Sequence, residues 1–424
     1  MTDPIKILSI STSDRYGGAG RAAWQLHDSI RKNGHESRML VKSKKTQDPD
    51  VLLLSSLAPK NRLYPSYEWL SNKCKNQWQH MLWRPYPEKK DVFLSDLRSS
   101  DFFGALKKID YDILQLHWIN LRFLPLRQLP KNKPIVWTLH DSWPFCGICH
   151  IPQDCPGYRG SCGRCPALQS TRPTDLSHRI WKKKQRIYQG LDLHIVAPSR
   201  WMAACAKKSS LLGDKDIRVI PNGIDTQAFS PGDRKSACLA LKLDPEKRHL
   251  LFSAIDSAKD RNKGLQQLTE ALNRIPEGQR RDWELILVGS RVPPEIPVSG
   301  LPVHNLGLIW STEQMANDYR AADLTLVPSL SENLSYSIME SLACGTPVVA
   351  FNIGGNSDMV EHLVNGYLAE GLDCEAFSKG ILRCLEHNTE GSLSQSARQT
   401  ILNRFTPEKV VREYLDLYSD LIKR

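Results

Sequence analysis

The segment Val327–Glu370 reads VPSLSENLSYSIMESLACGTPVVAFNIGGNSDMVEHLVNGYLAE, and it decides the class of fold. A polar loop carrying Glu332 is followed by apolar residues at helical spacing, which predict a helix that contains Glu340. Gly and Pro within Cys344–Pro347 end that helix. The apolar run Val348–Phe351 then predicts a buried parallel strand, so the segment has the alternating order of an α/β protein.

Two carboxylates in this segment are candidates for ligand binding. Glu332 and Glu340 are just over two helical turns apart, so both face the same side if the helix begins near Glu332. Ionised carboxylate oxygens accept several hydrogen bonds, which suits sugar hydroxyls. The pair alone is also typical of a helix-start acid followed by a solvated glutamate, and this simpler interpretation is favoured until other residues are considered.

The segment resembles the E-x7-E region of the retaining GT-B glycosyltransferases of family 4, in a branch that makes colanic acid and other exopolysaccharides. Glu332, Glu340, Ala343–Ala350, Gly354–Gly355 and Val364–Leu368 carry the resemblance. It implies an α/β fold with two Rossmann-like domains facing a cleft and a C-terminal helix that crosses back to the first domain. It also implies a hexosyltransferase that needs no cofactor for catalysis.

The resemblance assigns roles around the two glutamates. Glu332 is expected to bind the donor sugar and Glu340 the ribose. Further nucleotide-sugar contacts are expected from the turn that opens the helix, which comprises Asn333, Leu334 and Ser335.

The length of 424 residues allows two or three domains. We expect an N-terminal domain over 1–205, a nucleotide-sugar domain over 206–404 and a returning helix over 405–424. No apolar run reaches the length of a membrane-spanning helix, and the first residues read as a strand rather than a signal sequence. A cytoplasmic protein is therefore expected, with peripheral attachment to the inner face of the cytoplasmic membrane as a further expectation.

Charge is unevenly distributed along the chain. Residues 1–200 contain 32 Lys and Arg against 17 Asp and Glu, whereas residues 201–424 contain 25 against 29. Tryptophans lie among cations in residues 59–103, and residues 174–188 predict a strongly basic helix. Both segments suit an anionic membrane surface, or equally a solvated basic face over a packed core.

Near the N-terminus, a strand at Ile5–Ile10 leads into Gly17, Gly18 and Gly20 and then a helix. Backbone N–H groups of such a turn can hold phosphate. The order G-G-x-G differs from the dinucleotide fingerprint G-x-G-x-x-G, which argues against NAD. In the family, this turn lies beside the donor diphosphate and the acceptor.

Two buried strands are predicted to end in histidine, at His117 and His140. Parallel sheets bind ligands at the carboxyl ends of their strands, so both positions suit a site. Thr138-Leu139-His140 matches the family's Thr-x-His segment, which assigns His140 to the reacting centre. His117 and Asp141 are weaker candidates.

A cysteine cluster follows, with Cys146, Cys149, Cys155, Cys162 and Cys165 within twenty residues. Two C-x2-C pairs are typical of a structural zinc site, and disulfides are the poorer explanation in a cytosolic chain. The resemblance selects four ligands, which are Cys149, Cys155, Cys162 and Cys165.

Lys263 precedes a predicted helix and matches the family's Lys-Gly diphosphate ligand. The family often has an Arg about six residues earlier, where this chain has Ser257, so Arg261 is the candidate replacement. We therefore predict a hexosyl transfer from a UDP- or GDP-sugar to a lipid-linked acceptor in exopolysaccharide, capsule or envelope synthesis, catalysed by Glu332, His140 and Lys263. The alternatives are a GT-B phosphorylase or epimerase, or a zinc-containing nucleic-acid-binding protein. The last is disfavoured by the acidic second half, and no nucleic acid partner is expected.

Overall fold

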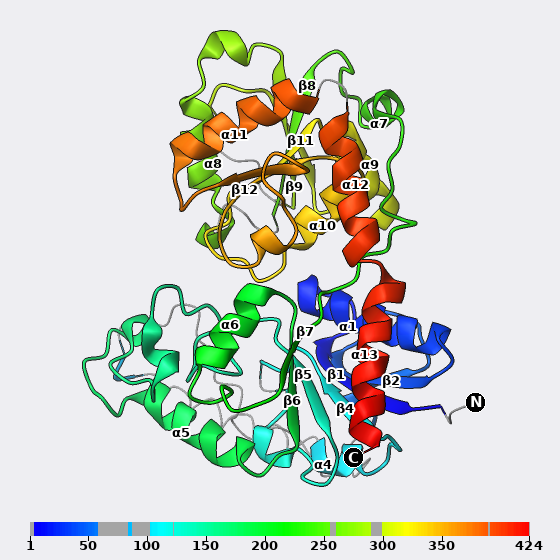
Figure 1. The fold of residues 1–424 in the computed structure, drawn as a ribbon, viewed down its shortest axis with the longest axis vertical. Helices are drawn as coiled ribbons and strands as arrows, with labels where there is room; N and C mark the ends of the chain where they lie inside the picture. The colour runs from blue at the N-terminus through cyan, green and yellow to red at the C-terminus, as the bar shows by residue number, and fades with distance from the viewer. Residues whose placement is uncertain are drawn as a thin grey trace. The chain divides into compact units, whose positions relative to one another are not determined.

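The computed structural model describes residues 4–57, 84–86, 102–121, 123–254, 260–289, 299–388 and 391–423. The chain forms two compact units, each built on one sheet with helices against it (Figure 1). The first unit comprises Met1–Ile220 and Val411–Arg424, and the second comprises Pro221–Val410. The tryptophans and cations between 59 and 103 lie almost wholly outside the described residues.

The first unit contains a parallel sheet in the order β3-β2-β1-β4-β5-β6-β7. Every residue of β4 and β5 is buried, as expected for strands covered on both faces. The strands are β1 (Lys6–Ser13), β2 (Glu36–Ser43), β3 (Val51–Leu53), β4 (Ile113–Leu116), β5 (Ile135–Thr138), β6 (Leu193–Ala197) and β7 (Ile217–Val219). The helices are α1 (Gly17–Lys32), α2 (Leu54–Leu57), α4 (Phe102–Leu106), α5 (Leu176–Tyr188), α6 (Arg200–Lys208) and α13 (Pro407–Ile422), with the short turns η1 (Leu126–Gln128), η2 (Pro156–Arg159) and η3 (Pro166–Leu168).

The second unit repeats this plan with the sheet order β10-β9-β8-β11-β12-β13, again parallel. Alternate residues of each strand enter the two core layers, one on each face of the sheet, as Leu250 and Leu251 illustrate. The strands are β8 (Arg248–Ser253), β9 (Trp283–Val288), β10 (Val303–Gly307), β11 (Leu324–Val327), β12 (Val348–Phe351) and β13 (Gly366–Ala369). The helices are α7 (Arg234–Ala240), α8 (Leu265–Asn273), α9 (Thr312–Ala321), α10 (Tyr336–Ala343), α11 (Cys374–His387) and α12 (Ser392–Arg404), with the turns η4 (Arg261–Lys263), η5 (Glu277–Gln279) and η6 (Asn356–Asp358).

The C-terminal helix α13 belongs to the first unit for most of its length. Its Tyr414 hydroxyl lies 2.8 Å from Thr138 Oγ1 of β5, and its Tyr418 hydroxyl donates to Gln115 Oε1 of β4 over 2.7 Å. These buried hydrogen bonds fix the helix against the middle of the sheet, and the predicted return of the C-terminus to the first domain is confirmed.

The boundary between the units lies later than the expected position at 205. The short strand β7 pairs with β6 through Ile195 and Ile217, so the first sheet ends only just before Pro221. The sequence did not predict β7 because three residues carry too little periodicity. Among the described residues, no helix has both the length and the apolar character needed to span a membrane.

Candidate active site

Three loops of the second unit lie at the carboxyl ends of the adjacent strands β8, β11 and β12. The loops after β8 and β11 are joined by hydrogen bonds at Asn262. Its side-chain amide donates to the Ser331 carbonyl over 2.9 Å, and its own carbonyl accepts from the Leu330 amide over 2.8 Å. This edge of a parallel sheet is where ligands bind in open α/β folds.

Two glycines allow these loops to approach one another. Gly264 has φ +73°, and a Cβ there would lie 1.8 Å from the Pro328 carbonyl oxygen. Gly354 has φ +53°, and a Cβ there would lie 1.8 Å from the Glu332 carbonyl oxygen. Only glycine combines this left-handed conformation with the absence of a side chain, so both glycines fix the position of the residues beside them.

Lys263 and Glu332 form an ion pair within this cluster of loops. Lys263 Nζ lies 3.0 Å from Glu332 Oε1, and the Ser329 hydroxyl donates to the same oxygen over 2.9 Å. The attraction of Glu332 raises the pKa of Lys263, so the ammonium stays charged. An ammonium has three N–H donors, and two remain for other acceptors. The predicted phosphate and sugar ligands are therefore direct neighbours.

Glu340 is buried on α10, where its Oε2 accepts a hydrogen bond from the Tyr319 hydroxyl over 2.9 Å. The helix begins at Tyr336, so Glu332 lies in the preceding loop and not on the helix. The condition for a shared helical face is thus not met. Tyr319 was missed by the sequence analysis, because an aromatic residue at helical spacing gives no sign that its hydroxyl holds a carboxylate.

The remaining predicted nucleotide-sugar residues surround the start of α10. Leu334 and Ser335 are buried and Asn333 is half-buried directly before the helix, and Ser335 caps it without a side-chain hydrogen bond. Backbone N–H groups at such a start can bind an anion. Arg261 is exposed in η4, the turn that also carries Lys263. Ser257 lies outside the described residues.

In the first unit, the glycine turn forms the start of α1, which begins at Gly17 with φ +70°. Gly18 and Gly20 lie in its first turn, and a Cβ at Gly20 would lie 3.0 Å from the Ser13 carbonyl oxygen. The strand β1, which precedes this turn, is joined to the loop after β4, since the Thr12 amide donates to the Trp118 carbonyl over 2.8 Å. The turn thus lies at the carboxyl edge of the first sheet.

His140 and His117 follow the neighbouring strands β5 and β4, and the structure brings them into contact. His140 Nε2 and His117 Nδ1 are 2.9 Å apart, and the rings stack. Burial lowers the pKa of His140 to about 4 and that of His117 well below its usual value. Both rings are therefore neutral near pH 7, and one donates its N–H to the other. His117 orients His140.

Asp141 has a supporting role. Its carboxylate accepts from the Trp118 indole over 2.7 Å and from the Trp143 amide over 3.0 Å. These bonds tie the loops after β4 and β5 together on either side of the histidines. Asp141 thus stabilises the backbone that carries His140.

The cysteine cluster lies in the loops after β5. The Cys149 and Cys165 thiols share a hydrogen bond, which raises the pKa of Cys149 and lowers that of Cys165 to about 7. Burial raises the pKa of Cys162 to about 11. Over the described ranges, no three or more His, Cys, Asp or Glu side chains are grouped closely enough to hold a metal ion. The four-cysteine zinc site stays a prediction from the sequence.

The basic helix of the sequence analysis is α5, but one of its cations, Lys184, is buried together with Trp181. Trp181 is buried, and Lys184 is 1 % exposed. Lys184 Nζ donates to the carbonyls of Trp143 and Cys146 and lies 3.5 Å from the Trp143 ring centre. Lys184 therefore joins α5 to the cysteine-bearing loop and adds nothing to the surface charge.

Comparison with known families identifies the class of protein that this fold and these loops define. Residues 16–228 match the family described as Glycosyltransferase Family 4, and residues 247–387 match the family described as Glycosyl transferases group 1. The first match covers half of the chain. The protein belongs to glycosyltransferase family 4.

Two relatives from Escherichia coli illustrate the range of the family. The chain is 27% identical over 216 residues to UDP-Gal:alpha-D-GlcNAc-diphosphoundecaprenol alpha-1,3-galactosyltransferase, covering 49% of this chain and 54% of the relative. It is 23% identical over 335 residues to WcaC of strain K12, a protein assigned to colanic acid biosynthesis as a glycosyl transferase, covering 74% and 76%. The chain spans about half the length of several other relatives it matches.

The fold is also that of known crystal structures. HepE from Anabaena in complex with UDP superposes with a TM-score of 0.63 at 18% identity, covering 98% of this chain and 100% of HepE. Identity at this level establishes the fold alone, and the fold is GT-B.

Proposed function

We propose that this protein transfers a hexosyl unit from a UDP- or GDP-sugar to an acceptor hydroxyl, with retention of the anomeric configuration. The observation that carries the proposal is the pairing of Lys263 with Glu332 at the carboxyl edge of the second sheet. In this pair, a cation that suits a diphosphate lies in direct contact with a carboxylate that suits sugar hydroxyls.

The chemistry follows from these groups. The bond between the anomeric carbon and the diphosphate oxygen breaks, and a bond to the acceptor oxygen forms on the same face. The acceptor proton passes to the departing phosphate oxygen, and a nucleoside diphosphate leaves. Lys263, Arg261 and the N–H groups at the start of α10 stabilise the charge on the leaving group. Glu332 orients the sugar, and Glu340, fixed by Tyr319, binds the ribose.

For the first unit we propose roles at the donor sugar and beside the acceptor. His140, held neutral by burial and oriented by His117, donates or accepts a hydrogen bond at the sugar without carrying charge. The turn of Gly17, Gly18 and Gly20 offers backbone N–H groups to phosphate.

The acceptor we propose is a lipid-linked sugar used for exopolysaccharide, capsule or envelope polysaccharide. This proposal is supported by the named activities of the two Escherichia coli relatives. A UDP donor is supported by the UDP complex of HepE. The exposed cations of α5 support peripheral contact with an anionic membrane from the cytoplasmic side.

The direct test measures transfer from a radiolabelled nucleotide sugar, with the donor chosen by thermal-shift screening of UDP-, GDP- and ADP-sugars. Lys263→Ala and Glu332→Gln should each lower the rate by roughly 100-fold or more, since both act on the transition state. The matched controls are Lys379→Ala and Glu375→Gln, because these residues form an exposed ion pair in the same unit. Full activity in either site variant would refute the proposal. The anomeric configuration of the product, read by NMR, tests retention, and phosphorolysis or epimerisation would give different products.

We also propose a structural zinc ion at Cys149, Cys155, Cys162 and Cys165. Their thiolates suit zinc, and these are the four cysteines that the resemblance to the family selects. The ion would stiffen the loop after His140 and take no part in the chemistry. Metal analysis of the purified protein should find one zinc per chain, and Cys155→Ser should release it. The site would be refuted if protein prepared under reducing conditions with zinc supplied contained no zinc.

A further inference from the structure

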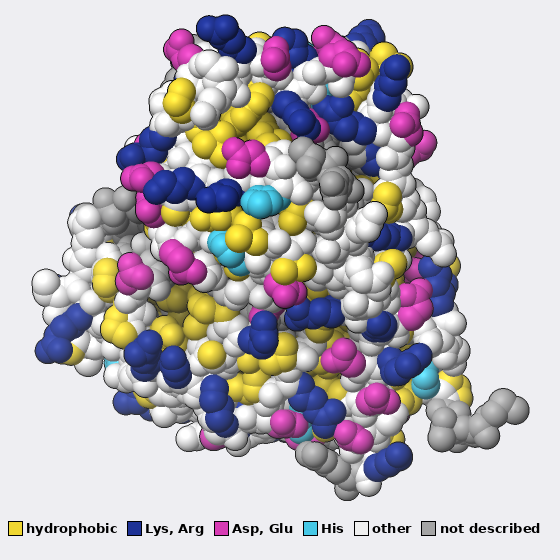
Figure 2. Space-filling view, turned by 45° about the horizontal axis from the view of Figure 1, so that its top comes forward, with side chains coloured by type: hydrophobic (Ala, Val, Ile, Leu, Met, Phe, Trp, Pro, Cys, Tyr) yellow, Lys and Arg dark blue, Asp and Glu magenta, His cyan; other side chains and the backbone are white. Residues whose placement is uncertain are grey.

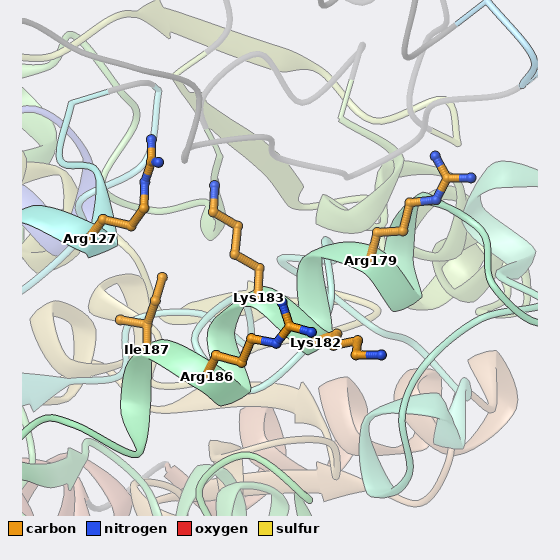
Figure 3. Close-up of a pocket in the computed structure, with 6 residues that line it drawn as sticks. All are labelled: Arg127, Arg179, Lys182, Lys183, Arg186 and Ile187. Atoms are coloured by element: carbon orange, nitrogen blue, oxygen red, sulfur yellow. The ribbon is translucent and has the colours of Figure 1, made fainter.

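A hollow of about 380 Å³ on the first unit is lined almost entirely by cations. Arg127 comes from η1, and the other lining residues come from α5. The lining consists of Arg127, Arg179, Lys182, Lys183, Arg186 and Ile187. Arg127 and Lys183 extend toward the same side from the two elements (Figure 3). Two separate parts of the chain thus direct positive charge at one place.

Neutralising carboxylates are missing from both elements. Neither 121–133 nor 176–191 contains Asp or Glu. Within the part of the chain that the structure describes, Arg127, Arg179, Lys182 and Arg186 form no ion pair. Over the face shown in Figure 2, cations and acids lie interspersed. The hollow therefore holds positive charge, on the four cations just named, that is not paired within the described residues.

The helix that carries this charge is firmly anchored on its other side. Trp181 is buried and its indole donates to the Ser210 hydroxyl over 3.0 Å. The buried ammonium of Lys184 donates to two backbone carbonyls of the cysteine-bearing loop. The Asp175 carboxylate caps the helix by accepting from the amides of Ser177 and His178. Because the helix is fixed, its cations stay near one another, and a bound anion would relieve their mutual repulsion.

We propose that this hollow is a binding site for phosphate groups, of the phosphate-ester or diphosphate type. Guanidinium groups bind phosphate oxygens in pairs, and lysines add charge from the side. Ile187 offers an apolar contact beside the charged groups, which suits a phosphate attached to a hydrocarbon. The same chemistry is presented by a lipid headgroup and by a soluble diphosphate. The site is distinct from the donor residues Lys263 and Glu332, and it does not depend on the proposed transfer.

The experiment compares two double variants of equal charge. Arg127→Gln with Arg186→Gln removes one cation from each element of the hollow. Lys207→Gln with Lys208→Gln removes two exposed cations from α6 in the same unit. Calorimetry measures the affinity for inorganic pyrophosphate, and flotation measures binding to phosphatidylcholine vesicles with and without phosphatidic acid. Both are done without nucleotide sugar.

The hollow variant should lose affinity about tenfold while the control variant keeps it, since each exposed charge pair contributes modestly. If the hollow variant loses binding to vesicles alone, the natural ligand is a lipid headgroup. If it loses binding to pyrophosphate alone, the natural ligand is a soluble diphosphate. Equal losses in both variants, or binding by neither assay in the unmodified protein, would overturn the site. The pyrophosphate titrations are made on both double variants in a Lys263→Ala background, so that the proposed donor site does not contribute and a failed transfer assay leaves this result independent.

Discussion

Asp318 on α9 gives a stability change with pH that can be calculated from its surroundings. The side chain is fully buried, and neither carboxyl oxygen has a hydrogen-bond partner among the residues that the structure describes. Burial raises its pKa from 3.8 to about 7. The protonated form is neutral and costs less to bury than the carboxylate, so the folded protein keeps this proton well above the pH at which the unfolded chain loses it.

The sign and size of the effect follow from linkage. Between the two pKa values the folded state binds more protons than the unfolded state, so stability falls as pH rises. The contribution is fully present below pH 3.8 and is lost as pH rises through 7. At about 1.4 kcal/mol per unit, the loss between pH 5 and pH 8 is about 2.5 kcal/mol. Asp318→Asn should remove this dependence, since an amide does not titrate in this range.

The measurement is the free energy of unfolding of the second unit, followed by hydrogen exchange of its strands in urea at several pH values. The quantity compared is the difference between the unmodified protein and Asp318→Asn, because other titrating groups cancel in that difference. Glu313→Gln, an exposed acid on the same helix, is the control and should give a constant difference. If the difference in unfolding free energy between the unmodified protein and Asp318→Asn did not change with pH, the reasoning would be refuted. Water or another polar group would then solvate the carboxylate.

Three further predictions concern the site loops. Gly354→Ala should destabilise the second unit by at least about 2 kcal/mol more than Gly371→Ala. Both glycines have positive φ, but only at Gly354 would a Cβ clash with a backbone atom, the Glu332 carbonyl oxygen; urea unfolding of the two variants tests this. Tyr319→Phe should cost about 1–3 kcal/mol, since it removes the hydroxyl that donates to the buried Glu340 carboxylate, and unchanged stability would contradict the importance of that bond. The His140 ring should show no titration by NMR between pH 8 and pH 5, with protonation only near pH 4; a midpoint near 6.5 would contradict its burial.

The fold was largely predictable because its signals are local. Long apolar runs separated by Gly, Pro and polar turns predicted strands of both sheets, among them β1, β5 and β12. Short elements such as β7 were missed because three residues show no periodicity. The buried position of Lys184 was missed because its partners are carbonyls, which any sequence supplies.

The candidate site was predictable residue by residue but not in its contacts. Lys263 and Glu332 are 69 residues apart, and no local pattern indicates that their side chains meet. The pairing depends on Gly264 and Gly354, which let three loops pack backbone against backbone. The same holds for His117 and His140, whose hydrogen bond depends on β4 and β5 being neighbours.

The ion pair constrains how a donor can be bound. Because Lys263 is already paired with Glu332, a diphosphate would gain from the remaining N–H donors of Lys263, from Arg261 and from the start of α10. Glu332 in turn keeps acceptor capacity on the oxygen that Lys263 and Ser329 do not occupy. The two residues therefore act as one unit: the carboxylate raises the pKa of the half-buried ammonium, and the ammonium orients the carboxylate through their hydrogen bond. Removing either changes the other, so the combined variant should be little worse than each alone.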